Sequence, residues 1–160
     1  MTSSPSQPVP DRSKYILLTP RSAKALSVIA IGGLYAWFLL KFLLTNNQPA
    51  LQLIIGALGL IGMVSSIVMF LCTYSFVANA PDKYLDEREI QDRNAAYTRA
   101  YIYAVSMLLV GYIASDVVGK VFSGVEVTSD IVTNYLNLAL FTCLIMPATI
   151  LAWRDRGSDD

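Results

Sequence analysis

The sequence predicts an all-α fold: a four-helix transmembrane bundle whose third span continues into a cytoplasmic helical extension. The first observation is composition, because hydrophobic residues make up 54% of the 160-residue chain and the mean hydropathy is +0.49, more than the core of a soluble domain needs. The second is that these residues gather in four runs. Crossing a hydrocarbon core of roughly 30 Å takes about 20 helical residues, and each run approaches that length.

The first two expected spans cover residues 25–44 and 51–77. The first carries one charge, Lys41, near its far end, where a long side chain can reach the headgroups. The second contains no charged residue and is long enough to tilt or to extend beyond the bilayer. Only "TNNQPA" separates the two runs, a turn by its Asn and Pro content. A helical hairpin is therefore expected.

The last two expected spans cover residues 100–122 and 131–153. The third is uncharged as far as Ser115, after which Asp116 and Lys120 appear, and the fourth is uncharged throughout. The connection "GKVFSGVEVTSD" offers Gly, Ser and Asp as helix breakers. These spans are expected to form a second hairpin.

Lysine and arginine set the orientation of the spans, because cytoplasmic loops carry an excess of them. Only Lys41 and Lys120 fall on one side of the expected membrane. The other ten, which lie before the first span, between the second and third, or after the fourth, are Arg12, Lys14, Arg21, Lys24, Lys83, Arg88, Arg93, Arg99, Arg154 and Arg156. Both termini are therefore expected in the cytoplasm.

The expected domain plan has three parts. Residues 1–20 begin with "MTSSPSQPVPDRS", which is rich in Pro and Ser and lacks a packing pattern, so we expect a disordered cytoplasmic tail there. Residues 21–156 form the four-span membrane domain. Residues 157–160 form a short cytoplasmic tail.

Charge is concentrated between the second and third spans. The stretch "PDKYLDEREIQDRNAAYTRAY", residues 81–101, holds nine of the 24 charged side chains, and we name it the charged segment. Pro81 suits a helix start, and the acids that follow it favour the positive end of the helix dipole. No Gly or Pro occurs in residues 82–110. The helix is therefore expected to run unbroken into the third span.

Two interpretations of the charged segment remain open. In one it is a solvated linker that fixes topology, with ion pairs between Glu89 and Arg93 and between Arg88 and Asp92, each four residues apart. In the other it is a docking helix whose pattern of opposite charges recognises a partner or a second copy. The docking residues would be Asp86, Glu87, Arg88, Glu89, Asp92 and Arg93.

The charged segment also carries a resemblance. The stretch "YLDEREIQDRNAAY" resembles the L-D-E-R-x-x-x-x-R-x-x-A-Y signature between the second and third spans of small uncharacterised bacterial four-helix membrane proteins. The residues that match are Asp86, Glu87, Arg88, Arg93 and Ala96. The resemblance implies a bacterial inner-membrane protein and brings no activity with it.

Small residues mark two helix faces that are expected to pack closely. In the second span Gly56, Gly59 and Gly62 are spaced by three residues, which lets another helix backbone approach. The third span has a matching face at helical periodicity. Its members are Ala96, Ala100, Ala104, Gly111 and Ser115. The two faces could meet within one chain or between two copies.

Charges inside a bilayer call for a functional hypothesis. Asp116 and Lys120 are one turn apart and lie toward the outer end of the third span. We expect an ion pair at the outer interface. The alternative is a proton relay in a transporter, for which Asp116 would be the carboxylate.

The residue inventory gives little support to catalysis. The chain has no histidine, the commonest general base, and Ser65, Ser66, Cys72 and Cys143 have no recognisable base at a meaningful spacing. We expect no catalytic residue, cofactor, metal site, disulfide or nucleic-acid partner. The leading hypothesis is a non-enzymatic accessory, regulatory or immunity-like subunit that contacts the lipid bilayer and another membrane protein or its own copy. A small homo-oligomeric transporter or channel is the alternative, and an enzyme acting on lipid or quinone comes third.

Overall fold

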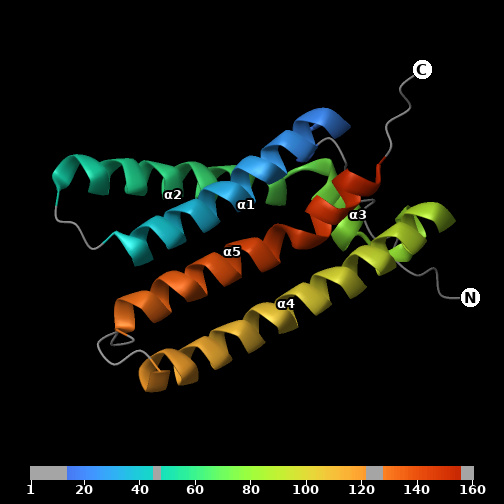
Figure 1. Cartoon of the computed structure of the whole chain (residues 1–160). Helices are drawn as coiled ribbons and strands as arrows, with labels where there is room; N and C mark the ends of the chain where they lie inside the picture. The colour runs from blue at the N-terminus through green and yellow to red at the C-terminus, as the bar shows by residue number, and fades with distance from the viewer. Residues whose placement is uncertain (1–13, 45–47, 122–127, 156–160) are drawn as a thin grey trace, which may run out of the picture.

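The computed structural model describes residues 14–44, 48–121 and 128–155. Within them the chain forms four long helices, a short helix and one 3-10 turn. In order these are α1 (Pro20–Leu43), α2 (Pro49–Phe70), α3 (Thr73–Asn79), η2 (Asp82–Tyr84), α4 (Glu87–Val121) and α5 (Ser129–Arg154) (Figure 1). Helices α1, α2, α4 and α5 are each long and apolar enough to cross a membrane. The predicted all-α bundle is confirmed, and its architecture is that of a multi-pass membrane protein.

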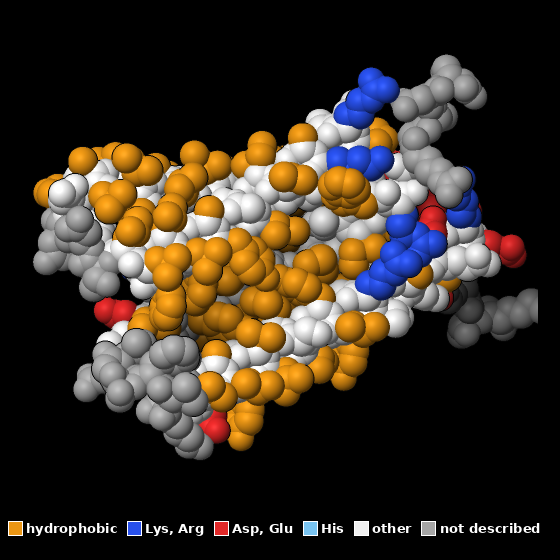
Figure 2. All heavy atoms as spheres, viewed as in Figure 1, with side chains coloured by type: hydrophobic (Ala, Val, Ile, Leu, Met, Phe, Trp, Pro, Cys, Tyr) orange, Lys and Arg blue, Asp and Glu red, His pale blue; other side chains and the backbone are white. Residues whose placement is uncertain are grey.

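Helix α5 lies at the centre of the bundle and packs against all four other α-helices. The long helices lie side by side in the order α2, α1, α5, α4, with α2 and α4 at the two edges (Figure 1). Helix α3 fits between α5 and α4 at one end. We call this end, formed by residues 14–20, 71–93 and 150–155, the charged end. Lys and Arg side chains gather there in Figure 2, while the visible flanks of the long helices are largely hydrophobic.

The interior is apolar, with a few hydroxyls that bond within their own helices. Leu34, Met69 and Ile145 are fully buried. Ser66 Oγ donates to the Gly62 carbonyl at 2.8 Å and Thr142 Oγ1 to the Leu138 carbonyl at 2.7 Å. Such bonds satisfy a hydroxyl where water is excluded.

The second span differs from the expected continuous helix over residues 51–77. Helix α2 ends at Phe70 and α3 begins at Thr73. The reason lies far away in the chain, because the Ile16 N–H donates to the Leu71 carbonyl at 3.0 Å and the Thr73 N–H donates to the Ile16 carbonyl at 3.1 Å. Residues 14–19, expected to belong to a disordered tail, therefore have defined backbone contacts. Residues 1–13 and 156–160 of the expected tails lie outside the described residues.

The charged segment also begins differently from the prediction. A helix was expected from Asp82, but residues 82–84 form the 3-10 turn η2 and α4 starts at Glu87. The unbroken run into the third span is confirmed, since α4 has 35 residues. At 1.5 Å per residue it is about 52 Å long, roughly 20 Å more than a hydrocarbon core requires.

Candidate functional site

A capping box fixes the start of α4. The Glu89 N–H donates to Asp86 Oδ1 at 2.6 Å, and the Asp86 N–H donates to Glu89 Oε2 at 3.2 Å. Two N–H groups that lack helical partners are thus satisfied reciprocally. This pairing explains why the helix starts at Glu87 instead of Asp82. The D-x-x-E spacing was readable in the sequence but was not among the predicted features.

Arg93 fastens the chain before α4 onto the helix. Its side chain is 13% exposed and forms an ion pair with Asp82, while Nη1 donates to the Ala80 carbonyl at 2.7 Å. A planar guanidinium can hold two acceptors at once. Arg93 therefore ties residues 80–82 to the second turn of α4.

A second set of contacts ties α4 and α3 to the end of α5. Arg154 Nη2 lies 2.7 Å from Asp92 Oδ1, which links α5 to α4. Tyr74 in α3 donates its hydroxyl proton to Asp155 Oδ2 at 2.8 Å, and Lys24 in α1 donates to the Asp155 carbonyl at 2.9 Å. Burial, and then the bond to Asp155, raise the pKa of Tyr74, so the phenol stays protonated as this bond requires.

The six expected docking residues therefore divide into two groups. Asp86, Glu89, Asp92 and Arg93 hold the charged end together, and the ion pairs of Asp92 and Arg93 are with α5 and η2, not along α4 as expected. Glu87 and Arg88 are exposed. Neither forms an ion pair with another residue that the structure describes. Arg88 also lines a pocket of about 290 Å³, together with Tyr74, Val77, Asp86, Glu89, Asp92, Leu151 and Asp155.

The glycines of α2 pack against α1. A Cβ on Gly62 would lie 2.8 Å from the Leu34 backbone nitrogen, and one on Gly59 would lie 2.7 Å from the Trp37 ring. Gly33, which was not among the predicted packing residues, meets Gly62 from the α1 side. The adjacent glycines at 32 and 33 were the available signal. Gly56 departs from the expectation, because a Cβ there would meet nothing within 4 Å.

The small residues of α4 face α3 and α5 instead of the glycines of α2. Ala96 is fully buried in a cluster with Ala78 and Leu151, and Ala100 is buried as well. Gly111 leaves room for the Tyr135 ring, which a Cβ would meet at 2.5 Å. Part of each smooth face therefore finds a partner within one chain, and the α2 face packs on α1 instead of α4. Gly56 and Ser115 are exposed.

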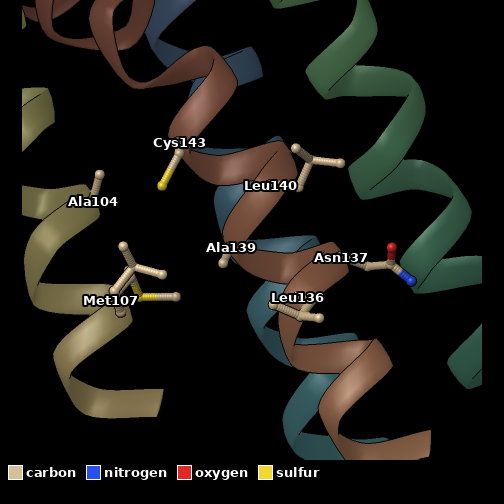
Figure 3. A pocket seen from close by; sticks show the side chains of 8 residues that line it. Ala104, Met107, Leu136, Asn137, Ala139, Leu140 and Cys143 are labelled. Atoms are coloured by element: carbon tan, nitrogen blue, oxygen red, sulfur yellow. The ribbon is translucent and has the colours of Figure 1, made fainter. Parts of the chain in front are cut away.

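An apolar groove of about 370 Å³ opens between α4 and α5 (Figure 3). Cys143 and Met107 point into the space between the two helices, whereas the Asn137 side chain points away from α4. Cys143 and Cys72 are both free thiols. The residues that line the groove are Ala104, Met107, Leu108, Leu136, Asn137, Ala139, Leu140 and Cys143.

The expected intramembrane charges lie toward the end of α4 remote from the charged end. Asp116 is exposed there, and it lies outside the groove between α4 and α5. The side chain of Lys120 lies outside the described residues, so the expected pair with Asp116 stays a prediction. Among the described residues, no three His, Cys, Asp or Glu side chains come together as a metal site would need.

Comparisons of the chain with protein-family models, curated proteins and solved structures gave no match. The resemblance of the stretch around Asp86 to small bacterial membrane proteins therefore stays a prediction. The candidate site rests on geometry alone: a helix start held by internal contacts, with Glu87 and Arg88 at its surface.

Proposed function

We propose that this chain is a multi-pass protein of the bacterial inner membrane, with both termini in the cytoplasm, and that it acts as a non-enzymatic accessory, regulatory or immunity-like subunit. It binds another membrane protein or a second copy of itself through the exposed start of α4. The observation that carries the proposal is the pair Glu87 and Arg88. They stand exposed on a helix start that the capping box, Arg93 and Asp92 hold in place.

A docking surface gains affinity when it is already in its bound conformation, because less freedom is lost on association. The contacts at the charged end provide that order. Adjacent charges of opposite sign favour a partner with the complementary pattern, which a second protein can supply. The segment from Asp82 to Arg99 has five acids and four bases, a net charge of −1. It is therefore poorly suited to an anionic lipid surface, which attracts clusters of Lys and Arg.

The proposed orientation is supported by the distribution of basic residues. Ten Lys and Arg residues are expected on the cytoplasmic side. Those that the structure describes, among them Lys24, Arg93 and Arg154, lie at the charged end or next to it. Reporter fusions after residue 160 and within the charged segment test this orientation. Activity from the cytoplasmic side is expected, and periplasmic activity at either position would contradict it.

A double reversal, Glu87→Arg with Arg88→Glu, tests the docking site because it preserves net charge. The double variant, a control variant and the wild type are each purified in mild detergent from the native membrane. We expect at least about tenfold less recovered partner, or about tenfold weaker self-association, corresponding to about 1.4 kcal/mol. Gln91→Glu, an exposed change one turn further along α4, is the control and should change neither. A strictly monomeric protein with no reproducible partner would overturn the proposal.

A small homo-oligomeric transporter or channel is the second candidate. It is favoured by Asp116, an exposed carboxylate within the candidate span Glu87–Val117, since charges at such positions commonly mark ion pathways. Ion or proton flux into reconstituted vesicles that disappears in Asp116→Asn would place this function first. Absence of flux in wild-type vesicles would remove it.

A further inference from the structure

The break between α2 and α3 has no local cause in the sequence. Residues 63–80 contain neither Gly nor Pro nor a charged side chain, and such a run normally continues as one helix. Nevertheless Cys72 is extended, with φ −85° and ψ 168°. The Ser75 and Phe76 N–H groups both donate to the Cys72 carbonyl, at 3.0 and 3.2 Å. The helix is interrupted at one defined point.

Residues 14–19, which we name the strap, supply the partners that the break needs. In a continuous helix the Leu71 carbonyl would accept from Ser75, and the Thr73 N–H would donate to the Met69 carbonyl. Ile16 takes both positions instead, accepting from Thr73 at 3.1 Å and donating to Leu71 at 3.0 Å. The strap thus replaces two of the bonds that a continuous helix would have with two backbone bonds of its own.

Side chains of the strap hold it against the bundle. The Tyr15 ring meets the Phe76 ring edge-on, with centroids 5.2 Å apart. Leu18 packs against the buried cluster that contains Ala30, Met69 and Cys72. Leu17, between these anchors, is 81% exposed. The strap is therefore attached along one side only.

The position of α3 controls the start of α4. Ala78 packs against Ala96, the Tyr97 hydroxyl donates to Asn79 Oδ1 at 3.1 Å, and Arg93 donates to the Ala80 carbonyl. If α3 turned to continue the axis of α2, all of these contacts would break together. The strap and the charged segment are thus coupled through α3.

We propose that the strap is a conformational switch: when Ile16 releases Leu71 and Thr73, α2 and α3 join into one helix and the start of α4 is freed. The inference goes beyond the proposed docking function, since it concerns two states of the chain itself. A ligand of the N-terminal segment can shift such an equilibrium only by preferring one state. The interrupted helix also lacks the bond from the Tyr74 N–H to the Phe70 carbonyl that a continuous helix would have, so the strap-bound state depends on the packing of Tyr15 and Leu18.

Cys72 is a native reporter of strap release. It is fully buried beneath the strap, and its Sγ lies 2.9 Å from the Met69 carbonyl. Burial raises the pKa of this thiol, and the protonated form reacts slowly with maleimides. Cys143→Ala removes the other thiol, so that labelling of the full chain by N-ethylmaleimide in detergent reports on Cys72 alone.

Ile16→Pro is the releasing variant, because proline cannot donate to the Leu71 carbonyl. Leu17→Pro is the matched control. Its N–H has no hydrogen bond to another described residue, and a following proline favours the extended conformation that Ile16 already has. We expect Ile16→Pro to speed Cys72 labelling at least about tenfold and Leu17→Pro to leave it unchanged. Equal labelling of Ile16→Pro and wild type, or an equal rise in both variants, would overturn the switch.

Hydrogen exchange then distinguishes a joined helix from a melted α3. In Ile16→Pro we expect faster exchange of amides in residues 14–19 and 87–93, while the amides of residues 73–79 stay protected. Fast exchange throughout 73–79 would show that α3 unfolds, which contradicts the proposal. Both measurements use the isolated protein in detergent and need no partner. Their outcome is therefore independent of whether the proposed docking partner exists.

Discussion

The hydroxyl oxygens of Tyr35 in α1 and Tyr103 in α4 lie 2.8 Å apart, within hydrogen-bonding distance, although α4 packs mainly against α5. The Tyr35 hydroxyl oxygen also lies 3.3 Å from Met107 Sδ. The hydroxyl of Tyr135 in α5 donates to the Met107 carbonyl. Hydroxyls in an apolar interior need such partners. These three contacts join α1, α4 and α5, which come from separate parts of the sequence.

A double-mutant cycle measures this link. Tyr35→Phe and Tyr103→Phe should each lower the free energy of unfolding, and their coupling energy should be about 0.6 kcal/mol, the typical size of a hydrogen bond between membrane helices. Unfolding by SDS in mixed micelles provides the measurement. Tyr112→Phe is the control, because the Tyr112 side chain is 73% exposed. Strictly additive effects of the two substitutions would show that the hydroxyl pair contributes nothing.

Close approach of α1 and α2 makes Gly62 sensitive to a single methyl group. In Gly62→Ala the new Cβ would lie 2.8 Å from the Leu34 nitrogen and 3.1 Å from the Gly33 carbonyl carbon, and backbone atoms cannot move aside cheaply. We expect the free energy of unfolding to fall by about 1–3 kcal/mol, the usual cost of overpacking. The same SDS titration measures it.

Gly56→Ala is the matched control for Gly62→Ala. It makes the same substitution two turns earlier on α2, where the new Cβ meets nothing within 4 Å. Alanine is the better helix former, so stability should be unchanged or rise by up to about 1 kcal/mol. Similar losses at both glycines would mean that α1 and α2 do not pack as described.

The capping box should be testable residue by residue. Asp86→Ala removes the acceptor of the Glu89 N–H, which typically costs about 1 kcal/mol, whereas Asn retains an oxygen that can cap. We expect faster hydrogen exchange in residues 87–90 for Asp86→Ala and near wild-type protection for Asp86→Asn. Equal exchange in the two variants would exclude the side-chain cap.

How far the sequence predicts this fold depends on the range of the forces involved. The four spans follow from apolar length alone, which is a property of consecutive residues. The bounds of the first and fourth are close to those of α1 and α5, whereas the second was expected to run to residue 77, past the end of α2. The end of α2 at Phe70 could not be foreseen, because its cause is Ile16, more than 50 residues away in the chain.

The candidate site shows the same division. Its capping box is local, and the spacing of Asp86 and Glu89 could have indicated it. Arg88 and Asp92 are four residues apart along α4, which predicted an ion pair between them. In the structure Asp92 pairs with Arg154 of α5 instead. A tertiary neighbour outcompetes a pair along the helix when packing places it nearer. Only the assembled bundle therefore shows that Glu87 and Arg88 remain exposed.

The ion pair between Asp92 and Arg154 allows stability and docking to be separated. Asp92→Arg places two like charges together between α4 and α5, and Arg154→Asp should restore the pair with reversed polarity. Both side chains are about one-third exposed, at 29% and 34%, so the single change should cost about 1 kcal/mol or less and the double change should recover most of it. Arg88→Gln is the control, because Arg88 is exposed and the loss of a positive charge from the first turn of α4 should not lower stability, whereas it should weaken partner binding. If Arg88→Gln lowered the free energy of unfolding as much as Asp92→Arg, the division of the charged segment into structural and docking residues would be wrong.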